Sequence, residues 1–240
     1  MTQTPEYQKT PFPALFSITR NRRAPATALG CLLVLLISMG IGGIFRQVHG
    51  HMPVLTPTVS YLSWLILGPL SFLALVLPNL DMRYKHLGHL SADAFYNPLL
   101  KSAAYFLLTA AGMYVCFMLF FIVPFFLYLA VIPAGALLYF YFLKMAKLAI
   151  RFLGREQNPY GENANYHIYA SGGIAAIVVT FLVPLLLPNS ISRFLGGELF
   201  LLIGGMAGLG YMLGRTLQQQ YDEEQFYLEN YTSSDSQTSL

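Results

Sequence analysis

Charged residues are scarce in this chain. Asp, Glu, Lys and Arg make up 10% of its 240 residues, whereas hydrophobic residues make up 55% and the mean hydropathy is +0.54. A soluble domain carries roughly 25% charged residues because its surface must face water. The scarcity therefore excludes an ordinary soluble domain and predicts an all-α, polytopic membrane protein.

Cysteine is also rare, and its positions exclude two classes of small protein. The two cysteines, Cys31 and Cys116, each lie within an apolar run. The sequence therefore has neither a disulfide framework nor a zinc-binding spacing, and we interpret both residues as small core residues. No small-residue cleavage pattern follows the first apolar run, which begins near Ala26. That run is accordingly predicted to be a retained membrane span and not a signal peptide.

Sequence signatures of chemistry are missing as well. No segment combines a nucleophile with a base and an orienting group, and no nucleotide-binding motif is present. The basic residues flank apolar runs instead of forming a basic domain, which argues against nucleic-acid binding. We therefore expect a non-enzymatic protein without a cofactor, with the lipid bilayer as its main partner.

Apolar runs of the length needed to cross a membrane occur six times. A crossing takes about 20 residues. The third and fourth runs form one apolar block from Ser102 to Ala149, which is too long for a single crossing at about 1.5 Å per residue. Pro124 divides this block more evenly than Pro133 does. The predicted spans are 26–46, 56–79, 102–123, 126–149, 167–188 and 196–215.

Lys and Arg are distributed unevenly between the two sides of this six-span arrangement. Twelve of the fourteen lie on one side, and only Arg46 and Arg193 lie on the other. If the long block were a single span, the division would be eight to six. Cytoplasmic loops are enriched in Lys and Arg. The distribution therefore predicts six transmembrane helices in the cell inner membrane, with the N-terminus and C-terminus both cytoplasmic.

The expected organisation has three parts: a cytoplasmic N-terminal arm at 1–25, a six-helix transmembrane domain at 26–215 and an acidic cytoplasmic tail at 216–240. The tail holds five of the eleven acidic residues and then becomes rich in Ser and Thr. We expect it to extend the sixth helix through Tyr227 and to be disordered beyond that residue.

Small residues on the last two spans predict close helix packing. Gly204 and Gly208 form a small-xxx-small pair that lets another helix approach the backbone. Gly197 lies earlier in the same segment, and Gly172 and Ala176 lie in the fifth span. We expect spans five and six to pack against each other within one chain. The alternative is that these glycine-rich helices contact a membrane-protein partner or form a homodimer.

The segment 81–96 is predicted to be an amphipathic helix on the cytoplasmic membrane surface. On a helix, His86, His89 and Asp93 stand at i, i+3 and i+7 and share one face. Arg83 and Lys85 would then lie near lipid head groups. The alternative is a metal site formed by His86, His89 and Asp93, because imidazole and carboxylate groups are ordinary metal ligands.

Three short sequences follow one another between residues 56 and 165: LGPL at 67–70, AFYN at 94–97 and GREQNPY at 154–160. Their order resembles that of bacterial four-helix membrane proteins distantly related to the plastid Tic-type import channel family. The resemblance implies a helical bundle, with protein translocation known only for the plastid branch, and it implies no catalytic residue. This chain departs from the pattern by having three further spans and by lacking the acidic residues that the family pattern leads us to expect in the loop before the third span.

The sequence leaves three functions open. The first is a scaffold or accessory subunit of a membrane complex, since the far-side loops are short and the helices are expected to pack closely. No ionisable residue lies deep in a span, which argues against an ion-coupled transporter. The second is a channel or facilitator for a small neutral or weakly polar solute. The third is a lipid-modifying enzyme built on His86, His89 and Asp93. Polar groups that would line a channel are Ser60, Tyr61, Ser63, Thr109 and Tyr114.

Overall fold

The fold is all-helical in the part of the chain that the structure describes. The computed structural model describes residues 22–33, 37, 55–87, 92–122, 127–156, 164–186 and 198–237. A helical segment occupies 23–33. The elements that follow are α2 (Leu55–Val76), the 3-10 helix η2 (Leu77–Asn79), α3 (Leu80–Leu87), α4 (Asp93–Ile122), α5 (Leu127–Leu153), α6 (Tyr166–Leu186) and α8 (Glu198–Gln237).

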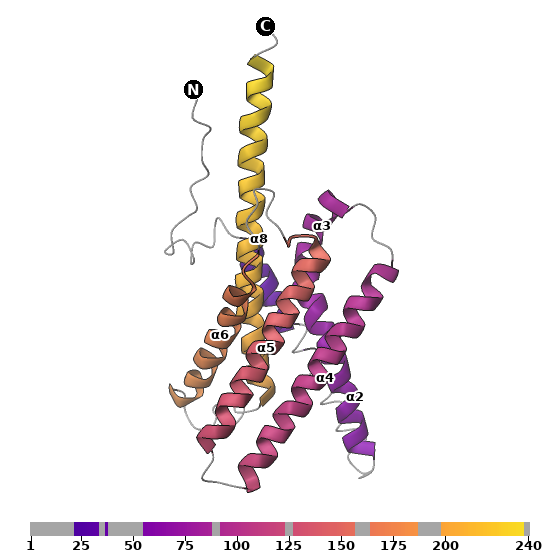
Figure 1. Ribbon diagram of the computed structural model, residues 1–240, viewed down its shortest axis with the longest axis vertical. Coiled ribbons are helices and arrows are strands. Elements are labelled where there is room, and N and C mark those ends of the chain that lie inside the picture. Colours follow the sequence, from indigo (N-terminus) through magenta and orange to yellow (C-terminus); the bar gives the residue numbers. More distant parts are fainter. Residues whose placement is uncertain are drawn as a thin grey trace.

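These helices form a bundle in which neighbours along the chain are also neighbours in space. The helix α4 packs between α2 and α5, and α6 packs between α5 and α8 (Figure 1). The segment 23–33 lies close to both α2 and α8. A Cβ atom at Gly30 would lie 3.5 Å from the Ala74 carbonyl oxygen of α2, and a Cβ atom at Gly210 of α8 would lie 3.2 Å from the Thr27 carbonyl oxygen. The C-terminal part of α8 projects beyond the other helices (Figure 1).

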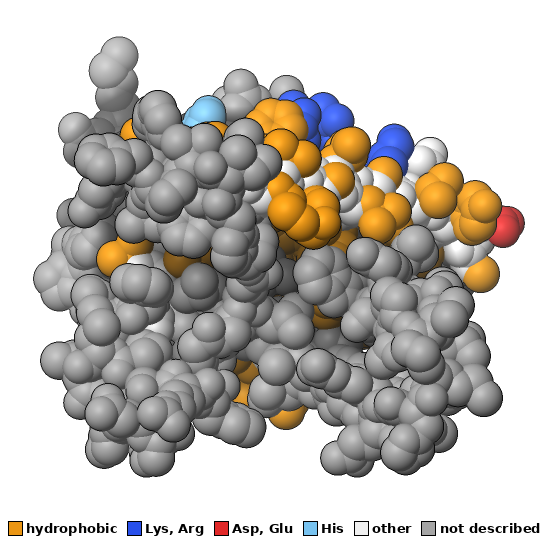
Figure 2. All heavy atoms as spheres, turned by 90° about the horizontal axis from the view of Figure 1, so that it is seen from below, with side chains coloured by type: hydrophobic (Ala, Val, Ile, Leu, Met, Phe, Trp, Pro, Cys, Tyr) orange, Lys and Arg blue, Asp and Glu red, His pale blue; other side chains and the backbone are white. Residues whose placement is uncertain are grey.

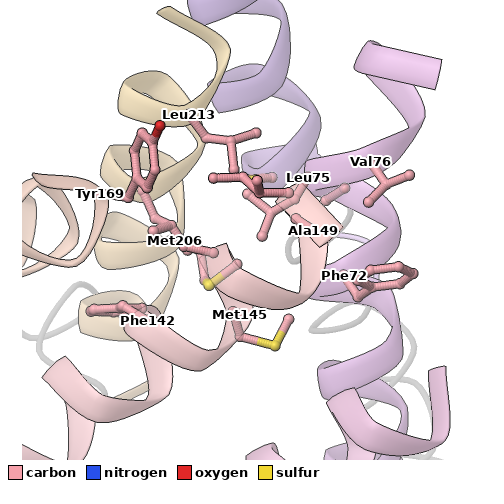
Figure 3. Close-up of a cluster of buried hydrophobic side chains, with 14 of the residues drawn as sticks. Phe72, Leu75, Val76, Phe142, Met145, Ala149, Tyr169, Met206 and Leu213 are labelled. Carbon is pink, nitrogen blue, oxygen red and sulfur yellow. The ribbon is translucent and has the colours of Figure 1, made fainter. Parts of the chain in front are cut away.

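The core of the bundle consists of large side chains from α2, α3, α4, α5, α6 and α8. Tyr141 and Phe142 of α5 are almost completely buried, as is Phe72 of α2. The rings of Phe72 and Phe152 meet edge to face at 5.4 Å between centroids, an arrangement that aromatic pairs favour. Figure 3 shows the cluster, with labelled side chains Phe72, Leu75, Val76, Phe142, Met145, Ala149, Tyr169, Met206 and Leu213.

The long apolar block from Ser102 to Ala149 is divided into two antiparallel helices. The helix α4 ends at Ile122 and α5 begins at Leu127. Pro133 lies inside α5, so the chain does not turn there, whereas Pro124 lies outside the described residues. Within the described residues, two helical stretches are long and apolar enough to cross a membrane, Ile66–Arg83 and Asp93–Cys116.

Glycines allow α6 and α8 to approach each other closely. A Cβ atom at Gly208 would collide with the Ala176 side chain and with the Gly172 carbonyl oxygen, and a Cβ at Gly204 would collide with Thr180. These glycines therefore face α6 of the same chain, which covers that face of α8. Gly197 lies outside the described residues.

The single amphipathic helix predicted over 81–96 is wrong. The helix α3 ends at Leu87, Ala92 lies in a turn and α4 begins at Asp93, so His86 and Asp93 belong to different helices. Gly88 lowers helix propensity by about 1 kcal/mol relative to Ala. Asp93 is favoured in the first turn of α4, where its carboxylate faces the positive end of the helix dipole.

The helical extension of the tail is longer than predicted. We expected helix as far as Tyr227, whereas α8 continues to Gln237 as one element of 40 residues. At about 1.5 Å per residue this helix is about 60 Å long, twice the thickness of a hydrocarbon core of about 30 Å.

Candidate functional site

Charged side chains gather at the end of the bundle from which α8 projects. They come from the start of the segment 23–33, from α3, from the first turns of α4, from the last turns of α5 and from α8 beyond Gly214. These residues form two groups. One is a set of arginine contacts that ties α8 to the bundle, and the other is a basic cleft between α4 and α5.

The end of α5 positions the most buried of these arginines. Gly154 has a φ of 70°, a left-handed conformation that glycine adopts without steric cost. Its N–H donates to the Arg151 carbonyl at 3.1 Å, and the Arg155 N–H donates to the Ile150 carbonyl at 3.0 Å. This pattern is a Schellman motif, which ends the helix and turns the next residue back against it.

Arg155 then forms an ion pair with α8. Its guanidinium donates to both carboxylate oxygens of Glu224, at 2.5 Å and 3.2 Å. The Arg155 side chain is 2% exposed and the Glu224 side chain is 10% exposed. A buried charge is costly unless it is paired and hydrogen-bonded, so this pair fixes the position of α8 relative to the end of α5.

Arg23 joins the N-terminal segment to α3 and α8. It donates to both carboxylate oxygens of Asp81, at 2.7 Å and 2.5 Å. Its guanidinium also lies 5.2 Å from the ring centroid of Tyr221. The hydrogen bonds and charge of Arg23 lower the pKa of the Asp81 carboxyl below its usual range, because they stabilise its charged form.

Arg83 is held by protein contacts. It donates to the Phe152 carbonyl at 2.7 Å and lies 4.0 Å from the centroid of the Phe152 ring. Nearby, the buried Asn79 side chain donates to Thr27 Oγ1 at 3.0 Å. The Arg83 contacts connect α3 to the end of α5, and the Asn79 hydrogen bond connects η2 to the segment 23–33. The position of Arg83 near lipid head groups stays a prediction.

The basic cleft lies between the start of α4 and the end of α5, and its volume is about 520 Å³. Lys144, Lys147 and Arg151 stand at i, i+3 and i+7 and so share one face of α5. Lys101 faces them from the antiparallel helix α4. In Figure 2, Lys and Arg side chains lie together at one edge of a largely hydrophobic described surface. The lining residues are Asp93, Ala94, Asn97, Pro98, Lys101, Tyr105, Lys144, Lys147, Leu148, Arg151 and Phe152.

Aromatic rings and one carboxylate hold three of these cations. Lys144 Nζ lies 4.8 Å from the Phe140 ring centroid, and Lys147 Nζ lies 5.6 Å from the ring centroid of Tyr166. Arg151 Nε donates to Glu156 Oε1 at 2.5 Å. Cation–π contacts orient an ammonium group without neutralising its charge. The cleft therefore keeps an excess of positive charge.

The structure places Arg83 and Asp93, the two residues of the predicted interfacial helix whose side chains it describes, in different surroundings. Asp93 lines the basic cleft, Arg83 packs on Phe152, and His89 lies outside the described residues. The side chains of Lys85 and His86 are also outside what the structure describes. Among the described residues no group of three His, Cys, Asp or Glu side chains is placed to hold a metal ion.

The structure describes the side chains of two predicted channel-lining residues, Thr109 and Tyr114. Thr109 donates to the Tyr105 carbonyl of its own helix at 2.8 Å, and Tyr114 is 59% exposed on the outside of α4. The side chains of Ser60, Tyr61 and Ser63 are outside the described part of the chain. The described positions thus provide no polar path through the bundle.

Sequence reasoning used Lys101, Lys144, Lys147 and Arg151 only to count charges and did not identify the cleft. The spacing of the three α5 cations was a usable signal, because residues at i, i+3 and i+7 share a helix face. The contribution of Lys101 depends on the register between α4 and α5, which the sequence does not give.

Comparisons of the chain with protein-family models, curated proteins and solved structures find no match. The resemblance to bacterial relatives of the Tic-type family therefore stays a prediction.

Proposed function

We propose that this chain is a six-span protein of the bacterial inner membrane, with both termini cytoplasmic, that acts as a non-enzymatic scaffold or accessory subunit of a membrane complex. The observation that carries the proposal is α8. This helix packs inside the bundle through glycines at one end and projects beyond the other helices at the other end (Figure 1). A helix fixed in this way can present a rigid docking surface in the cytoplasm.

Exposed apolar side chains support placement of the bundle in a bilayer. Leu108 on α4 is 70% exposed, Ile132 on α5 is 71% exposed and Val179 on α6 is 60% exposed. Such a distribution over several outer helix faces is costly in water and favourable against lipid. The charged contacts described above lie at one end of the bundle, as the positive-inside rule requires of a cytoplasmic face.

The contacts that hold α8 in place favour a scaffold role over the role of a mobile tether. Arg155 pairs with Glu224, and Arg23 lies against Tyr221, so two contacts hold the helix beyond the predicted membrane span. A tethered but mobile tail would need neither. Tyr141, Phe142 and Leu209 are buried in the described centre of the bundle. No observation on the described residues therefore favours the channel.

Site-specific photocrosslinking in intact cells tests the proposal. A photoreactive residue at Leu228, which is 59% exposed on α8, is expected to give a discrete protein adduct. The matched position is Val179, which is similarly exposed on α6 but is expected to face lipid. Absence of a protein adduct at Leu228 contradicts the scaffold role, and an adduct at Val179 alone contradicts the assignment of docking to α8.

A further inference from the structure

We propose that the basic cleft between α4 and α5 binds the phosphate of an anionic glycerophospholipid, whose acyl chains lie on the adjoining exposed apolar surface of the same two helices. The proposal goes beyond the scaffold role and rests on the bilayer placement in the proposed function.

The charge of the cleft favours an anionic ligand. Lys101, Lys144, Lys147 and Arg151 line it together with a single carboxylate, Asp93. Among the described residues, Arg151 is the lining cation that has a carboxylate partner. Like charges held close together repel each other, and a bound phosphate relieves that repulsion. The excess of cations over acids selects a head group with net negative charge over a zwitterionic one.

The size and neutral groups of the cleft fit a phosphodiester head group. A volume of about 520 Å³ lies within the range of roughly 300–1,000 Å³ that is usual for small-ligand sites. The side chains of Tyr105 and Asn97 also line the cleft and offer hydrogen bonds. The Asp93 carboxylate at the same site can accept a hydrogen bond from a head-group hydroxyl, which a glycerol head group has.

The surface below the cleft distinguishes a lipid from a free anion. Lys101, Tyr105 and Leu108 follow one stripe of α4 at helical spacing, and Leu108 is 70% exposed. On α5, Phe140 stands four residues before Lys144 and is 55% exposed. The cations therefore lie at the bundle end, and exposed apolar side chains continue the same two stripes toward its middle. A free phosphate would use only the first part of this surface, whereas a phospholipid would use both.

Cleft variants of the full-length protein in mild detergent test the inference. Native mass spectrometry measures the apparent affinity for added phosphatidylglycerol, with phosphatidylcholine and inorganic phosphate as comparison probes. Each basic residue near a phosphate surface contributes about 1 kcal/mol, or about fivefold in affinity. We expect Lys101→Gln to weaken phosphatidylglycerol binding about fivefold and Lys101→Gln/Lys144→Gln to weaken it about 25-fold. The control is Arg22→Gln, which removes an exposed cation outside the cleft and should leave the affinity unchanged.

A second variant separates the lipid from a free anion. Leu108→Gln should weaken phosphatidylglycerol binding while leaving all four lining cations in place. Lys101 is exposed, so Lys101→Gln alone keeps the test valid if the double variant fails to fold.

Three results would each overturn the inference: equal affinity for phosphatidylglycerol and phosphatidylcholine, unchanged affinity in Lys101→Gln, or displacement of the lipid by equimolar inorganic phosphate. Cysteine labelling tests the membrane topology independently of lipid binding. If labelling supports the six-span topology and lipid binding fails, only the lipid-site inference is rejected.

Discussion

The pair of Arg155 and Glu224 shows how one backbone conformation determines a contact far away in the sequence. Gly154 adopts a left-handed conformation that ends α5, and the next residue then points into the space between α5 and α8. In the sequence, GREQNPY was singled out only for its resemblance to a family of membrane proteins, which implies no contact with α8. The signal that sequence reasoning missed is glycine directly after a helix and directly before an arginine, which is typical of a helix terminus.

Removing one partner of this pair should strongly destabilise the protein. Glu224→Gln leaves the Arg155 guanidinium buried at 2% exposure without a counter-charge, a change that typically costs about 3–5 kcal/mol. We expect a clear fall in the thermal unfolding midpoint of the full chain in detergent. Glu156→Gln provides the control, because its ion pair with Arg151 is exposed on both sides and contributes little. Equal midpoints for the two variants would contradict the structural role of the buried pair.

Individual helices were easier to predict than the contacts between them. The apolar runs and the excess length of the block 102–149 predicted two separate helices, α4 and α5, because a helix that crosses a membrane must match its thickness. Small residues gave the contact between α6 and α8 because close approach requires them. The break between His86 and Asp93 was missed because amphipathic spacing does not show where a helix ends. The basic cleft was missed because it depends on two helices lying side by side in one register.

At the scale of a single helix, Gly208 should tolerate no side chain. A Cβ at this position would collide with Ala176 and with the backbone of Gly172. We expect Gly208→Ala to destabilise the bundle by about 1–3 kcal/mol, the usual cost of overpacking. Gly135 in α5 is the matched control, because a Cβ there would have no neighbour within 4 Å. Gly135→Ala should leave stability unchanged or raise it through better helix propensity.

Thermal unfolding of both variants in the same detergent checks this prediction. A variant Gly208→Ala as stable as Gly135→Ala would mean that α6 and α8 are not in close contact, and the assignment of this face to packing within one chain would fail.

The whole molecule combines a charged end with apolar sides. In the described residues the buried Arg155–Glu224 pair, the Arg23–Asp81 pair and the basic cleft all lie toward the end from which α8 projects. The predicted six-span arrangement has the same asymmetry, with twelve basic residues on one side and two on the other. In the structure, several of these cations hold helices together and four line one cleft, which is a reason for their clustering that does not depend on membrane insertion.

The side of the membrane on which each loop lies is a property of the whole molecule, and cysteine labelling can test it. The two native cysteines are buried, so a single introduced cysteine should dominate labelling by a membrane-impermeant maleimide. His49→Cys and Asn158→Cys place that thiol in the first far-side loop and in the second cytoplasmic loop of the six-span arrangement. In intact cells with a permeable outer membrane, we expect labelling at position 49 and protection at position 158. Disruption of the inner membrane should expose position 158 as well.

The unmodified chain gives the background labelling of Cys31 and Cys116, and a known periplasmic and a known cytoplasmic cysteine calibrate the reagent. The result follows from the number of crossings between the two positions. His49 and Asn158 are separated by three predicted spans, 56–79, 102–123 and 126–149, and an odd number of crossings puts them on opposite sides. If the block 102–149 crossed only once, the number would be even and both positions would label alike. Labelling of both from the same side would therefore overturn the six-span arrangement and, with it, the placement of the basic cleft on the cytoplasmic face.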